Sequence, residues 1–182
     1  IFIKHMILFL LGYMGCGKST YGKLLSNKIE NDFIDLDSYI VKREDMSISE
    51  IFASKGELYF RKVEHLYLKE LLNIQSDVII ALGGGTPCYA NNMELISQSD
   101  NSTSIFLDTN LDVLTERLFY QKENRPLIKK IKSKENLKTF IAKHLFERRD
   151  FYNKSEYILK LVDEDTDFVV DQLLDIYDKV TS

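Results

Sequence analysis

The stretch GYMGCGKST, residues 12–20, contains residue types suited to binding phosphate. Four residues separate Gly12 from Gly17, and Lys18 and Ser19 follow, which is the spacing of a phosphate-binding loop. Glycines let backbone N–H groups approach phosphate oxygens, and a following helix points its N-terminus at the anion. Lys18 would reach the terminal phosphates, and the Ser19 hydroxyl would bind Mg²⁺. The loop therefore predicts a nucleotide site.

Two carboxylates follow in DFIDLD, residues 32–37, which we interpret as a short strand. Side chains alternate along a strand, so Asp35 and Asp37 would point to the same side, with Ile34 and Leu36 in the core. Such a pair can divide metal binding and hydroxyl binding between its members. The alternative is that one of them, above all Asp37, only caps the next helix.

Three consecutive glycines, 83–85, end another apolar run. A backbone without side chains lets a ligand contact its N–H groups directly. The alternative is a flexible loop that binds no ligand, which would have the same sequence.

The arginines differ in their placement on expected helices. The helix over 133–152 has an apolar stripe made by Leu137, Phe140, Ile141 and Leu145. Arg148 continues this stripe, and Arg149 is turned about 100° away. A guanidinium on a core-facing stripe needs an anionic partner, so we expect Arg148 to bind a ligand and Arg149 to be solvated. Arg61 is open, because a structural pair with a neighbouring Glu explains it equally well.

A basic stretch, QKENRPLIKKIKS, lies between two expected helices. It suits a flexible cover that closes over polyphosphate, with a solvated loop as the alternative. Within it we favour Arg125, because Pro126 restrains its backbone.

Other polar residues are set aside. Asp108 resembles a magnesium ligand after an apolar run, but Asp112 beyond it favours helix capping. His5, His65 and His144 have no partners at catalytic spacing, so we interpret them as structural.

The elements between these motifs alternate in type. Short apolar runs predict five strands, at 6–11, 32–37, 77–82, 103–107 and 157–162. Helical segments separate them, which predicts an α/β fold: a parallel sheet with helices on both faces, in three layers. Ligands of such sheets bind beyond the carboxyl ends of the strands, where the motifs lie.

Composition narrows the class of protein. The 182 residues are 45% hydrophobic and 29% charged, as expected for one soluble domain. A net charge of −4 argues against a nucleic-acid binder, and no apolar run approaches the about 18 residues of a membrane span. Cys16 and Cys88 lie far apart, which favours a reducing, cytoplasmic setting over a disulfide or zinc site. A monomer is the default.

Taken in order, the motifs resemble shikimate kinase. GYMGCGKST, FIDLD, GELYFRKVE, GGG, RPL and ERRDFY follow one another over about residues 6–161. The resemblance implies a P-loop kinase domain of the nucleoside monophosphate kinase type over 1–182, with a substrate-binding helical region at about 38–73 and a mobile lid at about 119–132. It implies transfer of the γ-phosphoryl group of ATP to the 3-hydroxyl of shikimate, in aromatic amino acid biosynthesis.

The resemblance also implies roles for single residues. Lys18, Asp37 and Arg125 would be catalytic, and Ser19 and Asp35 would face magnesium. The nucleotide would be bound by Gly15, Cys16, Gly17, Lys18, Ser19, Thr20, Arg117 and Arg125. Shikimate would be bound by Asp37, Arg61, Gly84, Gly85, Arg148, Phe52 and Phe60.

This account requires Asp37, Arg61 and Arg148 to converge on one cavity beside the phosphate loop. Two departures from the family pattern are Cys16, in place of the usual serine, and the acidic segment LVDEDTDF, which leaves adenine recognition open. The alternatives are another small-metabolite kinase, such as one for gluconate, and a nucleotide-dependent switch.

Overall fold

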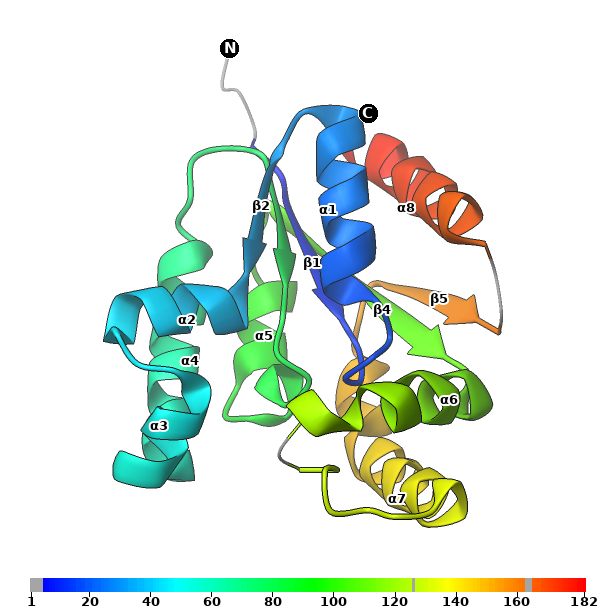
Figure 1. Ribbon diagram of the computed structural model, residues 1–182. Helices are drawn as coiled ribbons and strands as arrows, with labels where there is room; N and C mark the ends of the chain where they lie inside the picture. The colour runs from blue at the N-terminus through cyan, green and yellow to red at the C-terminus, as the bar shows by residue number, and fades with distance from the viewer. Residues whose placement is uncertain (1–4, 126, 163–164) are drawn as a thin grey trace.

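A computed structural model describes residues 5–125, 127–162 and 165–182. In these residues a five-stranded sheet has the order β2-β3-β1-β4-β5, and every neighbouring pair is parallel (Figure 1). The strands are β1 (Ile7–Leu11), β2 (Asp32–Asp35), β3 (Val78–Ala81), β4 (Ser102–Thr109) and β5 (Tyr157–Leu161). The expected parallel sheet is therefore confirmed.

Helices connect consecutive strands. The α-helices are α1 (Lys18–Ile29), α2 (Leu36–Glu44), α3 (Ile48–Ser54), α4 (Glu57–Leu71), α5 (Asn92–Ser97), α6 (Leu111–Gln121), α7 (Lys134–Tyr152) and α8 (Thr166–Thr181). Short 3₁₀ turns lie at Thr86–Cys88 and Lys122–Asn124. No helix among the described residues is long and apolar enough to cross a membrane.

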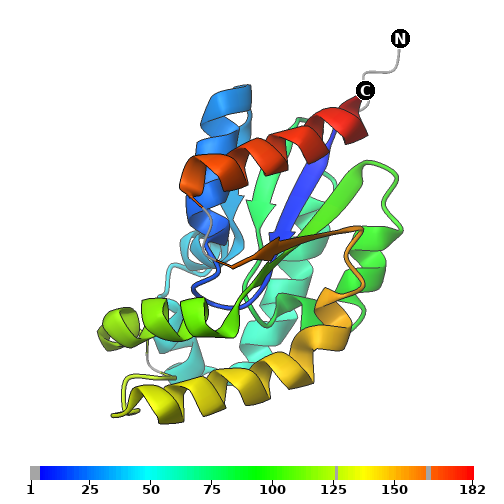
Figure 2. The same cartoon turned by 90° about the vertical axis from the view of Figure 1, so that its right-hand side faces the viewer.

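The central strand β1 separates two hydrophobic cores. Its side chains are all 0% exposed, and they alternate between the faces of the sheet. Ile7, Phe9 and Leu11 pack with residues of α2 to α5, and Leu8 and Leu10 pack with residues of α1, α6 and α8. Figures 1 and 2 show these two helical layers on opposite sides of the sheet. The three-layer prediction is confirmed.

The strand expected over 32–37 is two residues too long. It ends at Asp35, whose Oδ1 accepts a hydrogen bond from the backbone N–H of Ser38 at 3.1 Å. Asp35 is thus the N-cap of α2, and Asp37 lies in the first turn of that helix. The strand position of Asp37 is therefore wrong, and the alternative that one of the two carboxylates caps the next helix is confirmed for Asp35 rather than for Asp37.

Candidate active site

The phosphate loop joins β1 to α1 in a backbone that requires glycine. Gly15 and Gly17 have φ of 81° and 100°, in the region that other residues rarely adopt. A Cβ on Gly17 would also collide with the ring of Tyr21. Cys16 is 0% exposed in the core beneath the loop, so only its backbone can face a nucleotide.

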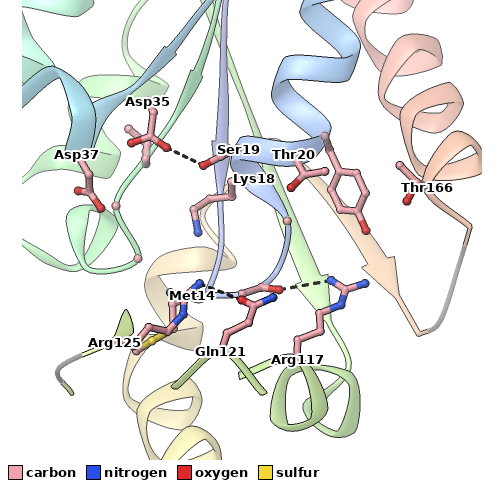
Figure 3. Close-up of a pocket in the computed structure, with 16 residues that line it drawn as sticks. Met14, Lys18, Ser19, Thr20, Asp35, Asp37, Arg117, Gln121, Arg125 and Thr166 are labelled. Carbon is pink, nitrogen blue, oxygen red and sulfur yellow. Dashed lines mark hydrogen bonds between the residues drawn. The ribbon is translucent and has the colours of Figure 1, made fainter. Parts of the chain in front are cut away.

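Lys18 begins α1 and lines a cavity of about 470 Å³ (Figure 3). Its Nζ donates to the carbonyl oxygens of Gly12 at 2.8 Å and Tyr13 at 3.1 Å. The ammonium is therefore held over the loop by neutral groups, and its charge is free to act on an anion.

Ser19 and Asp35 also line this cavity and are hydrogen-bonded to each other. The Ser19 hydroxyl donates to Asp35 Oδ2 at 2.6 Å. Hydroxyl and carboxylate oxygens are ligands that suit Mg²⁺, which keeps several waters and binds few protein groups beside substrate phosphates. The two residues fit a magnesium site that phosphate oxygens complete.

Asp37 lines the same cavity and is partly buried. Burial raises the pKa of its carboxyl to about 6, helped by the negative charges of Asp35 and Glu64 and opposed by Lys18 and Arg61. A carboxylate with a raised pKa is a stronger base for a hydroxyl proton near neutral pH.

Helix α6 forms the opposite wall, shown below the carboxylates in Figure 3. Arg117 donates to the Gly15 carbonyl oxygen at 3.3 Å, and Arg125 lies 3.4 Å from Gln121 Oε1. Thr20 and Thr166 lie at the far end of the cavity. Cations therefore line one side and carboxylates the other, as a magnesium–polyphosphate complex requires.

A second cavity of about 590 Å³ lies across the glycine turn 83–85. Arg61, Gly85 and Arg148 line it. A Cβ on Gly85 would come within 2.8 Å of Arg61 Nη1, so the absence of a side chain there is needed for the guanidinium. Two guanidinium groups in one cavity suit a carboxylate ligand, because arginine offers paired hydrogen bonds to it.

Helix α7 holds the middle of the glycine turn. The Tyr152 hydroxyl donates to the Gly84 carbonyl oxygen at 2.6 Å, and Arg148 Nη1 lies 3.5 Å from the same oxygen. Tyr152 is 0% exposed, and burial raises its pKa. Two side chains of α7 thus hold the Gly84 carbonyl group in place, and Gly84 also lines the first cavity.

The expectation that Asp37, Arg61 and Arg148 share one cavity is wrong. Asp37 opens into the first cavity, and the two arginines open into the second, because the glycine turn runs between them. The charge of Arg61 nevertheless acts on Asp37, whose pKa it lowers against the larger effect of burial. A Cβ on Gly84 would lie 3.8 Å from Arg148 Nη1. Gly84 lines the first cavity and Gly85 the second, so the two cavities adjoin at the glycine turn.

Comparison with known proteins identifies the family. The shikimate kinase family model matches residues 14–178. The chain belongs to the shikimate kinase family. A shikimate kinase from Flavobacterium johnsoniae is 48% identical over 167 residues, which are 92% of this chain and 96% of that protein. The resemblance drawn from the ordered motifs is confirmed.

Solved shikimate kinases share the fold. The enzyme from Bacteroides thetaiotaomicron superposes with a TM-score of 0.87 at 36% identity, covering 95% of this chain and 98% of that one. The enzyme from Acinetobacter baumannii, solved in complex with shikimate, gives 0.83 at 27% identity, with 95% and 93% covered. The P-loop fold predicted for this chain is confirmed.

Two aromatic residues do not lie where the resemblance to shikimate kinase implied. Phe52 and Phe60 line neither cavity. Phe60 is 4% exposed in the core, and Phe52 stacks on it with ring centroids 4.9 Å apart. The Arg61 guanidinium lies 5.3 Å from the Phe60 ring centre. Phe60 therefore packs beside Arg61, and Phe52 packs on Phe60.

The expectations for Arg149 and Asp108 were only partly right. Arg149 is half-exposed to solvent as expected, but it is paired, because its Nη2 lies 2.7 Å from both carboxylate oxygens of Asp108. Asp108 is inside β4, and Asn110 is the residue that caps α6. The helix-face argument still separates the two arginines, since Arg148 lines a cavity and Arg149 faces Asp108.

The arginines that lack a carboxylate partner among the described residues all line one of the two cavities. Among the described residues, Arg117, Arg125 and Arg148 form no ion pair with a carboxylate, and each lines one of the two cavities. The others, Arg43, Arg61 and Arg149, each pair with a glutamate or an aspartate.

Glu64 is the neighbouring glutamate that pairs with Arg61, and the sequence analysis did not name it. It is 0% exposed, accepts from Arg61 Nη1 at 2.7 Å and from the Thr86 hydroxyl at 2.5 Å. Glu64 thus joins Arg61 to the residue after the glycine turn. A signal was present: Glu64 lies on the buried stripe of α4, three residues from Arg61, where an acidic side chain needs a partner.

The lid expected at about 119–132 overlaps the end of α6 and the irregular segment that follows it. Helix α6 runs to Gln121, so the segment begins later than 119, and Pro126, invoked to restrain Arg125, lies outside the described residues. Ile128 is 0% exposed and packs into the core, which anchors the segment next to Arg125. The mobility of the lid stays a prediction.

Proposed function

We propose that this chain transfers the γ-phosphoryl group of ATP to the 3-hydroxyl of shikimate, giving shikimate 3-phosphate and ADP in aromatic amino acid biosynthesis. The observation that carries the proposal is the pairing of two sites across Gly84 and Gly85. A phosphate loop with a basic carboxylate lies on one side, and two arginines lie on the other. The related enzyme solved with shikimate supports this choice of acid.

The nucleotide lies in the first cavity in this proposal. The loop N–H groups and Lys18 hold its phosphates, Arg125 reaches the transferring group, and Arg117 lies nearer the base. Mg²⁺, bound by Ser19 and Asp35, would neutralise phosphate charge. The arrangement supplies positioning and charge neutralisation, which are the main needs of phosphoryl transfer.

The acid lies along the glycine turn. Arg61 and Arg148 grip its carboxylate in the second cavity, and its ring passes the side-chain-free backbone of Gly84 and Gly85. Asp37 accepts a hydrogen bond from the 3-hydroxyl and takes its proton as the bond to phosphorus forms. We further propose that the chain acts as a cytoplasmic monomer.

A coupled assay of ADP release tests the proposal. The purified chain with Mg-ATP receives shikimate, gluconate or no acceptor. We expect turnover to depend on shikimate, because gluconate has no ring to carry its hydroxyl past the glycine turn. ADP release that is indifferent to shikimate would reject the proposed function.

A further inference from the structure

Tyr13 occupies an unusual place in the phosphate loop. Its carbonyl oxygen accepts from Lys18 at 3.1 Å, but its side chain is 1% exposed and lines neither cavity. The ring instead points toward helix α7, which belongs to a segment more than a hundred residues later in the chain. Tyr13 is therefore not a ligand of the nucleotide through its side chain, and its packing needs another reason.

One face of α7 contacts this ring. Phe140, His144 and Arg148 are spaced four residues apart, so they lie in a row along the helix. The Tyr13 hydroxyl lies 3.1 Å from His144 Nδ1, and the His144 ring packs against Phe140 with centroids 4.2 Å apart. The guanidinium carbon of Arg148 lies 5.7 Å from the Tyr13 ring centre. A single loop side chain thus contacts both the histidine and the arginine.

The protonation of the pair follows from its surroundings. Burial raises the pKa of Tyr13 to about 12, so the hydroxyl keeps its proton at neutral pH. Burial, and then the charge of Arg148, lower the pKa of His144. The neutral imidazole can therefore accept a hydrogen bond from the Tyr13 hydroxyl at Nδ1 while Nε2 carries the ring proton.

Within the described ranges, the guanidinium of Arg148 is held by neutral groups only. Its polar contacts include the Gly84 carbonyl oxygen at 3.5 Å, a long hydrogen bond, and the Tyr152 hydroxyl, and it forms no ion pair among the described residues. A cation over an aromatic face is attracted to it and keeps its N–H groups available at the edge. The Tyr13 ring, which packs in the core and is bonded to His144, therefore helps to fix where Arg148 presents its donors to the second cavity.

We propose that Tyr13 and His144 are positioning residues, which join the phosphate loop to α7 and hold the Arg148 guanidinium in place to bind the acid's carboxylate. The two side chains act through Arg148 and touch neither substrate. The inference rests on the proposed function and assigns a role to a histidine that the sequence alone left as structural.

Steady-state kinetics of three variants test the inference. Tyr13→Phe keeps the ring and removes the hydroxyl, and His144→Ala removes the acceptor. Each is expected to raise the KM for shikimate about fivefold, the effect of one lost hydrogen bond, with kcat and the KM for ATP within about twofold of wild type. His144→Asn, whose amide oxygen can occupy the place of Nδ1, restores most of the affinity. A variant that was only less stable would not raise the KM for shikimate while leaving kcat and the KM for ATP unchanged. His144→Asn would not restore the affinity of such a variant.

Two further variants sharpen the test. Tyr67→Phe removes another buried tyrosine hydroxyl, bonded at 2.6 Å to Glu44 away from both cavities, and leaves the KM for shikimate unchanged. The double variant Tyr13→Phe/His144→Ala is no worse than the worse single variant, because both remove the same bond. An unchanged KM in both single variants of an active wild type overturns this inference alone. A wild type without shikimate-dependent turnover rejects the proposed function, and the inference with it.

Discussion

Opposing charges act on the carboxylate of Asp37. Its burial and its acidic neighbours favour the protonated form, and Lys18 and Arg61 only partly offset them. The folded chain therefore holds this group at a pKa of about 6, above the value of 3.8 for a free side chain. A raised carboxyl pKa means that the ionised form, which the proposed chemistry needs, lowers the stability of the fold.

The variant Asp37→Asn separates chemistry from stability. We expect kcat to fall at least about 100-fold, because the base is lost. The free energy of unfolding at pH 7 should rise by about 1–3 kcal/mol, since the ionised carboxylate is removed. The stabilising contribution of the protonated acid is complete below the unfolded pKa and is lost as pH rises through about 6. The variant's advantage should therefore shrink between pH 6 and pH 4 in urea titrations, and an equal difference at both pH values would contradict the account.

Arg148 and Arg149 are neighbours with different partners. Arg148→Ala should raise the KM for shikimate about 100-fold, the effect of losing a charged hydrogen-bonded pair. Arg149→Ala is the matched control, since it breaks a half-exposed pair with Asp108 and should change that KM less than about threefold. Equal losses in the two variants, measured in the same assay, would show that Arg148 does not bind the acid.

At the scale of elements, the sequence predicted which segments are strands or helices better than it predicted where those segments begin and end. Apolar runs identified β1 and β3, whose residues are all buried, because a sheet covered on both faces needs such runs. The edge strands β2 and β5 have partly exposed residues. The boundary between β2 and α2 was misplaced because Asp35 both ends the strand and caps the helix, which alternation of side chains cannot reveal.

Helix α4 offers a matched pair of acidic residues for testing how Arg61 is held. Glu64→Gln keeps the shape of the side chain and removes the charge that faces Arg61, so the KM for shikimate should rise about tenfold. Glu70→Gln, on the same helix, removes an exposed partner of Arg43 and should leave that KM within about twofold. If both glutamine variants bind shikimate like the wild type, Glu64 does not position the arginine.

At the scale of the whole molecule, parallel strands bring distant motifs to one edge. The phosphate loop follows β1, Asp35 ends β2, and the glycine turn follows β3, so the chain order alone predicted their meeting. The division into two cavities could not be predicted. It depends on the path of the glycine turn, held by Tyr152, and on the partner of Arg61, which are contacts between side chains of different elements.

The central claim is that one acid spans both cavities. A crystal structure of the chain with shikimate and a non-hydrolysable ATP analogue tests it most directly. The account predicts the carboxylate of shikimate between Arg61 and Arg148, and its 3-hydroxyl within hydrogen-bond distance of Asp37 and in line with the terminal phosphate. Shikimate bound with its carboxylate away from both arginines, or with the 3-hydroxyl turned from Asp37, would contradict it.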